Sequence, residues 1–210
     1  MNSNKLKDIF LLLNKHFPNV KTSLDFSNEF EAYVSILLSV QTKDKMVNKV
    51  TKKLFMHYKT YKDIANTNIK TLSKYINSIG LYTHKSNYLI CGSQMIIDHY
   101  NSKLPRKLDD LIKLPGIGRK VANVILSEYF HINEGIAIDT HNIRISQRIG
   151  ISKSKDPKMI EQLIMRDLSR KHWNKYSLLI IELGRNICSA GNPKCSICPI
   201  SYYCDYFQKL

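Results

Sequence analysis

The sequence contains 210 residues, which is enough to bury one or two hydrophobic cores. Its content of 43% hydrophobic and 23% charged residues is typical of globular proteins and argues against a disordered chain. No run of about 18 apolar residues is present, so we expect no membrane-spanning helix. The first ten residues, MNSNKLKDIF, lack the apolar segment of a signal peptide, so we expect a protein that is not exported.

The chain is strongly basic. Lysine and arginine number 32 against 17 aspartates and glutamates, which gives a formal net charge of +15 at pH 7 and a pI of about 9.6. One interpretation is a solvated lysine-rich surface. The other is a nucleic-acid partner, because basic side chains release counterions when they neutralise backbone phosphates. A membrane partner is not expected, since we find no basic amphipathic helix with an aromatic face.

Apolar residues recur every three or four positions along most of the chain, a spacing that predicts amphipathic helices. In chain order, the apolar stripes cover Leu6–Phe17, Phe30–Leu38, Val47–Tyr58, Ile69–Ile76, Tyr88–Met95, Leu108–Leu114, Val121–Ile125, Ile143–Ile149, Ile160–Leu168 and Trp173–Leu183. Gly80 and Gly184 are placed to end two of these helices, and the lone Cys91 is expected to be a small buried apolar residue. Sustained strand-like alternation is absent, so the predicted fold class is all-α.

Two glycines lie between a pair of predicted helices in the segment LPGIGRKVANVIL, residues 114–126. Gly116 and Gly118 allow a tight turn and expose backbone N–H groups beside a helix N-terminus, a geometry that binds phosphate. A plain helix–turn–helix joint with capping glycines is the alternative. The neighbouring cations Lys113, Arg119 and Lys120 favour phosphate.

Four of the five cysteines lie close together near the C-terminus, in the pattern C-x6-C-x2-C-x5-C: Cys188, Cys195, Cys198 and Cys204. Four thiolates within 17 residues can surround one compact centre. A disulfide scaffold would spread its cysteines more widely, and zinc sites usually pair two separated C-x2-C knuckles. The single C-x2-C favours a cluster bound by four cysteines over zinc, which stays the alternative.

The chain resembles the endonuclease III family of helix–hairpin–helix DNA glycosylases and AP lyases. The resemblance covers nearly the whole sequence and rests on segments that follow the family's order: LLSVQTKD (37–44), IGLYTHK (79–85), LPGIGRKVAN (114–123), IDTH (138–141) and the terminal cysteines. It implies that the four cysteines hold a [4Fe–4S] cluster.

Lys120 and Asp139 fall where the family keeps its nucleophile and its catalytic aspartate. Lys120 is predicted in the first turn of a helix, where the helix dipole disfavours an ammonium by about 0.3–1 kcal/mol. Desolvation in a pocket would have to lower the pKa of the amine much further before a neutral amine could attack a sugar and form a Schiff base. Asp139 could stabilise positive charge on the sugar and move protons, or simply cap the helix that follows.

The resemblance also implies how a damaged base is reached. Such enzymes extrude the base and fill the gap with side chains from two loops, and the matching positions are Gln41 and Leu81. A helix end and an ordinary core leucine are the alternatives. Further DNA contacts are expected at Leu114, Gly116, Gly118, Arg119 and His141. Val40, Thr42 and Thr83 depart from many relatives, which bears on lesion recognition.

Taken together, the resemblance implies an all-α, two-lobed enzyme. Residues 22–132 would form a six-helix domain with the helix–hairpin–helix, and residues 1–21 with 133–210 a cluster-bearing domain. Because relatives without the lysine only excise the base, we expect a bifunctional glycosylase and AP lyase. It would act as a monomer on double-stranded DNA with oxidised pyrimidines or abasic sites, cleaving 3′ to the abasic site, in the bacterial cytoplasm at the nucleoid.

Three alternatives remain open. The first is a glycosylase of different lesion specificity. The second is a non-enzymatic DNA-binding protein that uses only the hairpin and the basic surface. The third is a zinc-bound nucleic-acid module.

Overall fold

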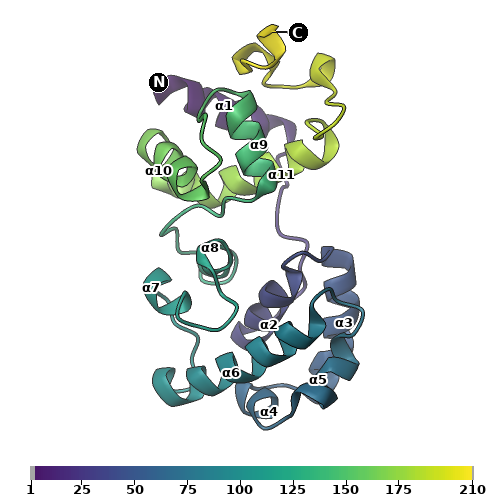
Figure 1. The fold of residues 1–210 in the computed structure, drawn as a ribbon. Coiled ribbons are helices and arrows are strands. Elements are labelled where there is room, and N and C mark those ends of the chain that lie inside the picture. Colours follow the sequence, from purple (N-terminus) through teal and green to yellow (C-terminus); the bar gives the residue numbers. More distant parts are fainter. Residues whose placement is uncertain (1–2, 210) are drawn as a thin grey trace. The chain divides into compact units, whose positions relative to one another are not determined.

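The computed structural model describes residues 3–209, which form helices joined by short connections with no strand among them (Figure 1). The all-α prediction is confirmed. The chain divides into two compact units. Ser23–Glu134 form the central unit, and the segments up to Thr22 and from Gly135 onward form the terminal unit. None of the helices in residues 3–209 combines the length and apolar character needed to cross a membrane.

The central unit is built around α2 (Glu29–Ser39), whose residues 32–38 are all buried. A helix buried on every side needs neighbours all round, and α3, α6 and α8 each pack against it. The central unit's other helices are α3 (Asp44–His57), α4 (Tyr61–Ala65), α5 (Ile69–Ile76), α6 (Tyr82–Tyr100), α7 (Leu108–Leu111) and α8 (Arg119–Glu128). The five-residue α4 was missed in the sequence because it is too short to show helical periodicity.

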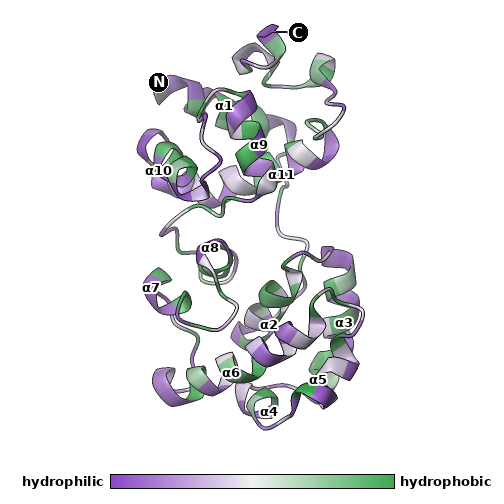
Figure 2. Cartoon of the chain, viewed as in Figure 1, coloured by the Kyte–Doolittle hydropathy of each residue, from purple (hydrophilic) through white to green (hydrophobic). Residues whose placement is uncertain are grey.

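The terminal unit has its own core, which shares no buried residue with that of the central unit. Its helices are α1 (Ser3–His16), α9 (Thr140–Arg148), α10 (Pro157–Asp167) and α11 (Trp173–Asn186), followed by the short 3-10 turns η2 (Cys195–Ile197), η3 (Ser201–Tyr203) and η4 (Phe207–Lys209). Another 3-10 turn, η1 (Arg170–His172), precedes α11. Figure 2 shows apolar and polar stretches on most helices of both units, as expected of amphipathic helices.

Neither of the two glycines that the sequence placed at helix ends is at one. Helix α5 ends at Ile76, four residues before Gly80. Helix α11 continues through Gly184, where a Cβ atom would run into Nδ1 of His141 on α9. Glycine is therefore needed at position 184 for close packing of two helices, which the local sequence does not reveal. The prediction for Cys91 was also wrong, since this residue is exposed on α6.

Candidate functional site

The hairpin between α7 and α8 contains two glycines that serve different purposes. Gly116 has a φ of 77°, and a Cβ atom there would lie 2.5 Å from the ring of Tyr88, so only glycine fits. Gly118 has an extended backbone and nothing within 4 Å of a Cβ position. It is the N-cap of α8 and supplies no capping side chain. The hairpin thus leaves open space beside a helix N-terminus, where an anion can approach backbone N–H groups.

Lys120 is the second residue of α8, which confirms its predicted position in the first helical turn. Its side chain is exposed, as is that of Arg119. An exposed amine is not desolvated, so the desolvation expected for a reactive lysine is left to a bound duplex. Leu114 is only 2% exposed and packs in the central core, so its side chain supports the hairpin and cannot reach DNA.

Asp139 caps α9. Its Oδ1 atom accepts hydrogen bonds from the backbone N of Asn142 at 2.8 Å and from Nδ2 of the same residue at 3.0 Å. Both bonds end on Oδ1, so the cap does not use Oδ2. The capping role foreseen in the sequence is confirmed, and it leaves one carboxylate oxygen for other chemistry. Asp139 belongs to the terminal unit and Lys120 to the central unit.

Gln41 and Leu81 share an unusual backbone conformation. Their φ angles are 54° and 59°, in the left-handed region that costs a non-glycine residue about 1–2 kcal/mol. Both side chains are exposed, and Leu81 is 58% accessible, so it is not the ordinary core leucine of the alternative interpretation. Their loops are neighbours, because a Cβ atom on Gly80 would lie 3.8 Å from the carbonyl oxygen of Gln41. Backbone strain of this kind concentrates at functional sites.

His141 is half-buried where α9 packs on α11. Its Nδ1 atom lies 3.1 Å from Nη2 of Arg144, and the same Nη2 donates to the carbonyl oxygen of Cys188 at 2.9 Å. These contacts give His141 a role in connecting α9 to the start of the cysteine segment.

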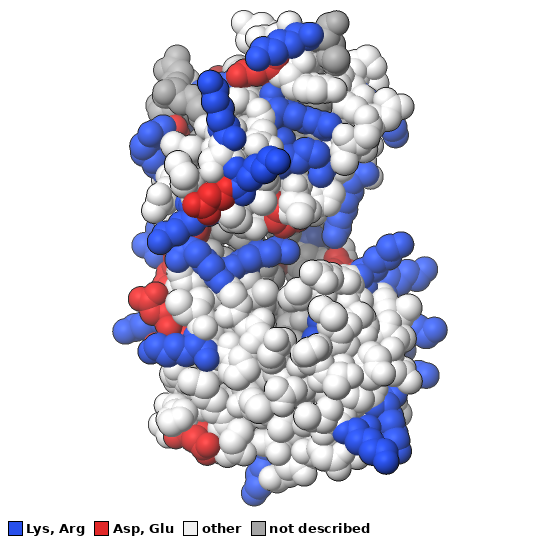
Figure 3. All heavy atoms as spheres, viewed as in Figure 1, with Lys and Arg blue, Asp and Glu red and all other residues white. Residues whose placement is uncertain are grey.

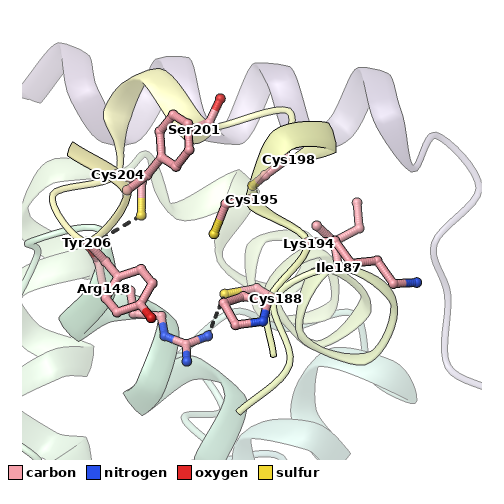
Figure 4. A pocket seen from close by; sticks show the side chains of 11 residues that line it. Arg148, Ile187, Cys188, Lys194, Cys195, Cys198, Ser201, Cys204 and Tyr206 are labelled. Carbon is pink, nitrogen blue, oxygen red and sulfur yellow. Dashed lines mark hydrogen bonds between the residues drawn. The ribbon is translucent and has the colours of Figure 1, made fainter. Parts of the chain in front are cut away.

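All four C-terminal cysteines line one pocket (Figure 4). Arg148 forms part of its wall. Its Nη1 atom donates to Sγ of Cys188 at 3.1 Å and to the carbonyl oxygen of Ser189 at 2.6 Å, and Nη2 donates to the carbonyl oxygen of Ala190 at 2.8 Å. The guanidinium also lies 4.9 Å from the ring centre of Tyr206. Sequence reasoning missed Arg148, although its spacing of four residues from Arg144 places both on one face of α9.

The thiols share a partly buried environment. Burial is the main cause that raises the pKa of Cys198 to about 11; a backbone hydrogen bond at Ile200 lowers the pKa, and the nearby thiols of Cys188, Cys204 and Cys195 raise it. Burial and the thiols of Cys188 and Cys204 also raise the pKa of Cys195, whereas the guanidinium of Arg148 lowers it. Such thiols need a cationic centre among them to become thiolates at neutral pH.

The four thiols that line this pocket match the donor set of an iron–sulfur cubane, which four cysteine thiolates hold. A zinc site needs four ligands at about 2.0–2.3 Å from one ion. A cubane binds each thiolate at a different iron, so its ligands stand farther apart.

Comparisons with known proteins identify the family. Residues 34–170 match the HhH-GPD superfamily base excision DNA repair protein, and residues 188–204 match the iron–sulfur binding domain of endonuclease III. Endonuclease III of Rickettsia conorii is 39% identical over 210 residues, covering 100% of both chains. Endonuclease III of Bacillus subtilis is 40% identical and covers 97% of this chain and 94% of that protein. The chain belongs to the endonuclease III family.

Solved structures agree with this assignment to the endonuclease III family. A trapped endonuclease III–DNA covalent intermediate superimposes with a TM-score of 0.94 and 35% identity, covering 100% of this chain and 98% of that one. A non-covalent endonuclease III–DNA complex gives 0.93 at the same identity and coverage. A thermostable thymine-DNA glycosylase, 20% identical with a TM-score of 0.88 over 99% and 98% of the chains, shares the fold.

As an endonuclease III family member, the chain is a DNA-binding base excision repair enzyme, a DNA glycosylase and AP lyase with a [4Fe–4S] cluster. The predictions of family, fold class, enzyme class and cofactor are confirmed. The iron–sulfur match begins at Cys188 and ends at Cys204, the two outer cysteines of the pocket.

Proposed function

We propose that the enzyme removes oxidised pyrimidines from double-stranded DNA and cleaves the strand 3′ to the resulting abasic site, with Lys120 as the nucleophile. The observation that carries this assignment is the position of Lys120. Its amine is exposed in the first turn of α8, two residues after Gly118, where a DNA backbone can approach without meeting a side chain. A nucleophilic lysine also accords with the covalent intermediate described for the related endonuclease III.

In the proposed reaction, neutral Lys120 attacks C1′ of the damaged nucleotide. The bond between C1′ and the base breaks, and the base leaves with the bonding electrons and gains a proton. Ring opening gives a Schiff base between Nζ and C1′, which acidifies the C2′ protons. Loss of one of these protons expels the 3′ phosphate by β-elimination, and water then releases the lysine.

Asp139 assists this reaction in the proposal. The carboxylate would stabilise positive charge that develops on the sugar as the base departs, and would take a proton from Nζ of Lys120 once that nitrogen has bonded to C1′. Its Oδ2 atom is the available oxygen, because Oδ1 holds the helix cap. The cap fixes the orientation of the carboxylate while it performs this role.

DNA binding in the proposal combines charge with a local wedge. Lysine and arginine are spread over the visible surface with few acidic residues between them (Figure 3), which suits a polyanionic partner. The amides beside Gly116 and Gly118, together with Arg119, would hold backbone phosphates. Gln41 and Leu81 would fill the space left by the extruded base. We further propose that the enzyme acts as a monomer at the bacterial nucleoid.

The four cysteines, Cys188, Cys195, Cys198 and Cys204, would each bind one iron of the cluster. We propose a structural role, in which the cluster holds a segment that has few regular helical bonds of its own. Contacts with α1 support the same segment: Nζ of Lys5 lies 3.0 Å from Oδ1 of Asp205, and the hydroxyl of Tyr203 donates to Oδ2 of Asp8 at 3.1 Å.

Borohydride trapping tests the proposed nucleophile. Reduction of a mixture of enzyme and abasic duplex should link wild-type protein covalently to DNA, because borohydride reduces the Schiff base to a stable amine. Lys120→Ala should abolish this product while duplex affinity, measured by fluorescence anisotropy, changes little. Lys74→Ala removes an exposed lysine from α5 of the same unit and serves as the control.

Two results would contradict the proposal. Undiminished trapping by Lys120→Ala would exclude this lysine as the nucleophile. Duplex binding by the wild type without any trapping would instead favour the non-enzymatic alternative. A panel of oligonucleotides with oxidised, alkylated and mismatched bases would separate oxidised-pyrimidine specificity from that of other glycosylases.

A further inference from the structure

Lys85 is the only lysine or arginine buried among the residues whose exposure the structure describes, with 3% of its surface accessible. A buried ammonium is stable only when its protons have acceptors. Its Nζ atom donates to the carbonyl oxygen of Leu38 at 2.9 Å, to that of Val40 at 2.5 Å and to Oγ1 of Thr42 at 3.1 Å. The three protons of the ammonium thus match three acceptors.

These acceptors surround Gln41, one of the two proposed wedge residues. Val40 and Thr42 are the immediate neighbours of Gln41, which has a φ of 54°. Leu38 lies in the last turn of α2, where carbonyl groups have no partner within the helix. Lys85 therefore binds the end of α2 and both neighbours of Gln41, through the carbonyl oxygen of Val40 on one side and the hydroxyl of Thr42 on the other.

Lys85 is also bonded to Leu81, the other proposed wedge residue. It lies in the first turn of α6, and its backbone N donates to the carbonyl oxygen of Leu81 at 3.0 Å. The side chain and backbone of one residue thus reach both loops. Leu81, Val40 and Lys85 line a shared pocket with Gly116 of the hairpin.

We propose that Lys85 is a positioning residue for base extrusion, which sets the spacing and backbone conformation of the loops that carry Gln41 and Leu81. This inference rests on the proposed function, in which these two side chains wedge into the duplex. Lys85 is buried, so it acts through the two loops and does not itself contact DNA.

The charge of Lys85 matters for this role, because a neutral amine has two protons to donate and would leave one acceptor without a bond. Burial lowers the pKa of Lys85 to about 8. The titratable groups that line the same pocket are His84 and Tyr88, both on α6, while α2 contributes apolar Leu37 and the hairpin contributes Gly116.

Lys85→Met and Lys85→Arg separate loop positioning from chemistry. Methionine keeps much of the length of the side chain but cannot donate a hydrogen bond, whereas arginine keeps the charge and several donors.

The probe is a duplex with 2-aminopurine beside a tetrahydrofuran abasic-site analogue. The fluorescence of 2-aminopurine rises when this base unstacks. Lys85→Met should reduce the preference for this duplex over undamaged duplex by about tenfold, as expected for lost buried hydrogen bonds, and should lower the fluorescence rise. Lys85→Arg should restore most of the preference for the abasic-site duplex and most of the fluorescence rise.

Borohydride trapping on a single-stranded abasic oligonucleotide reports chemistry without extrusion from a duplex. The yield of trapped product should be unchanged in Lys85→Met. A variant that had lost its fold would lose this product as well. Lys62→Met, at an exposed lysine on α4, is the matched control for loss of one charge. Unchanged lesion preference and fluorescence in Lys85→Met would overturn the proposal.

Two further measurements keep the inference testable. In the wild type, the unstacking signal should fall as the pH rises from 7 to 9.5, with a midpoint near 8, and this transition should be absent in Lys85→Arg. Identical pH profiles in the wild type and Lys85→Arg would overturn the proposal even if Lys85→Met failed to fold.

The double variant Gln41→Ala/Leu81→Ala separates this proposal from the proposed function. If it keeps full unstacking, the wedge assignment is wrong and the Lys85 proposal falls with it. If the double variant loses unstacking while Lys85→Met keeps it, only the Lys85 proposal is overturned.

Discussion

Nη1 of Arg148 lies 3.1 Å from Sγ of Cys188, which joins helix α9 to the first cysteine of the C-terminal pocket. The same guanidinium donates to the carbonyl oxygens of Ser189 and Ala190, so it holds three consecutive residues of the cysteine segment. A planar fork of donors suits this task better than the single ammonium of lysine. Arg148 is therefore a support for the cluster that no cysteine pattern predicts.

Replacement of this arginine should loosen the cluster. Arg148→Met leaves one sulfur and two carbonyl oxygens without their donors, which we expect to destabilise the terminal unit by about 2–3 kcal/mol. The visible absorbance of the cluster should bleach faster in the presence of a chelator. Lys158→Met removes an exposed cation from α10 of the same unit, and it should bleach at the wild-type rate. Equal rates in the two variants would show that the Arg148 contacts do not stabilise the cluster.

Asp139 permits a separation of capping from catalysis. Asparagine is as good an N-cap as aspartate, so Asp139→Asn should keep the thermal stability of the wild type, whereas Asp139→Ala should lose about 0.5–2 kcal/mol. If the charge has a chemical role, both variants should lose base excision to a similar and large extent. The measurement is single-turnover base release alongside thermal unfolding. Full activity in Asp139→Asn would leave Asp139 with the capping role alone.

The hairpin glycines offer a similar contrast. Gly118→Ala places a methyl group in open space and replaces glycine by a poorer N-cap residue, so the protein should fold with a loss of about 0.5–1 kcal/mol of stability. Its duplex affinity should fall, because the methyl group occupies the space through which a DNA backbone would approach.

Gly116→Ala should instead destabilise the central unit, since it combines a positive φ with a clash against Tyr88. Anisotropy titrations at two salt concentrations and thermal unfolding distinguish the two effects. Unchanged affinity in Gly118→Ala would show that DNA does not approach at this glycine.

Loss of a cluster ligand should affect one unit far more than the other. Cys198→Ser should yield colourless protein whose C-terminal segment is cleaved rapidly by protease. The central unit should keep its helices, because the two cores share no buried residue. Circular dichroism and limited proteolysis measure these outcomes.

The control is Cys91→Ser, at the exposed cysteine of α6, which should change stability by less than about 0.5 kcal/mol and keep the brown colour. A stable brown Cys198→Ser protein would contradict its role as a ligand.

Much of the helical architecture could be read from the amino-acid sequence, because helical periodicity is a local property. The stripe from Phe30 to Leu38 predicted α2, and the position of Gly118 predicted that Lys120 would lie in the first turn of the next helix. The cysteine spacing predicted an iron–sulfur centre for the same reason, since four ligands within 17 residues can meet without help from distant segments.

Contacts between distant segments decided the remainder. Gly184 is needed because His141 packs against it from α9. Leu81 has a left-handed backbone, although local rules would place that conformation at its neighbour Gly80. Lys85 resembles any surface lysine in the sequence, yet its acceptors lie more than 40 residues away. Burial and hydrogen-bond partners depend on which helices pack together. The sequence alone therefore predicted most of the helices and the candidate reactive side chains, and only tertiary packing decided which residues hold them in place.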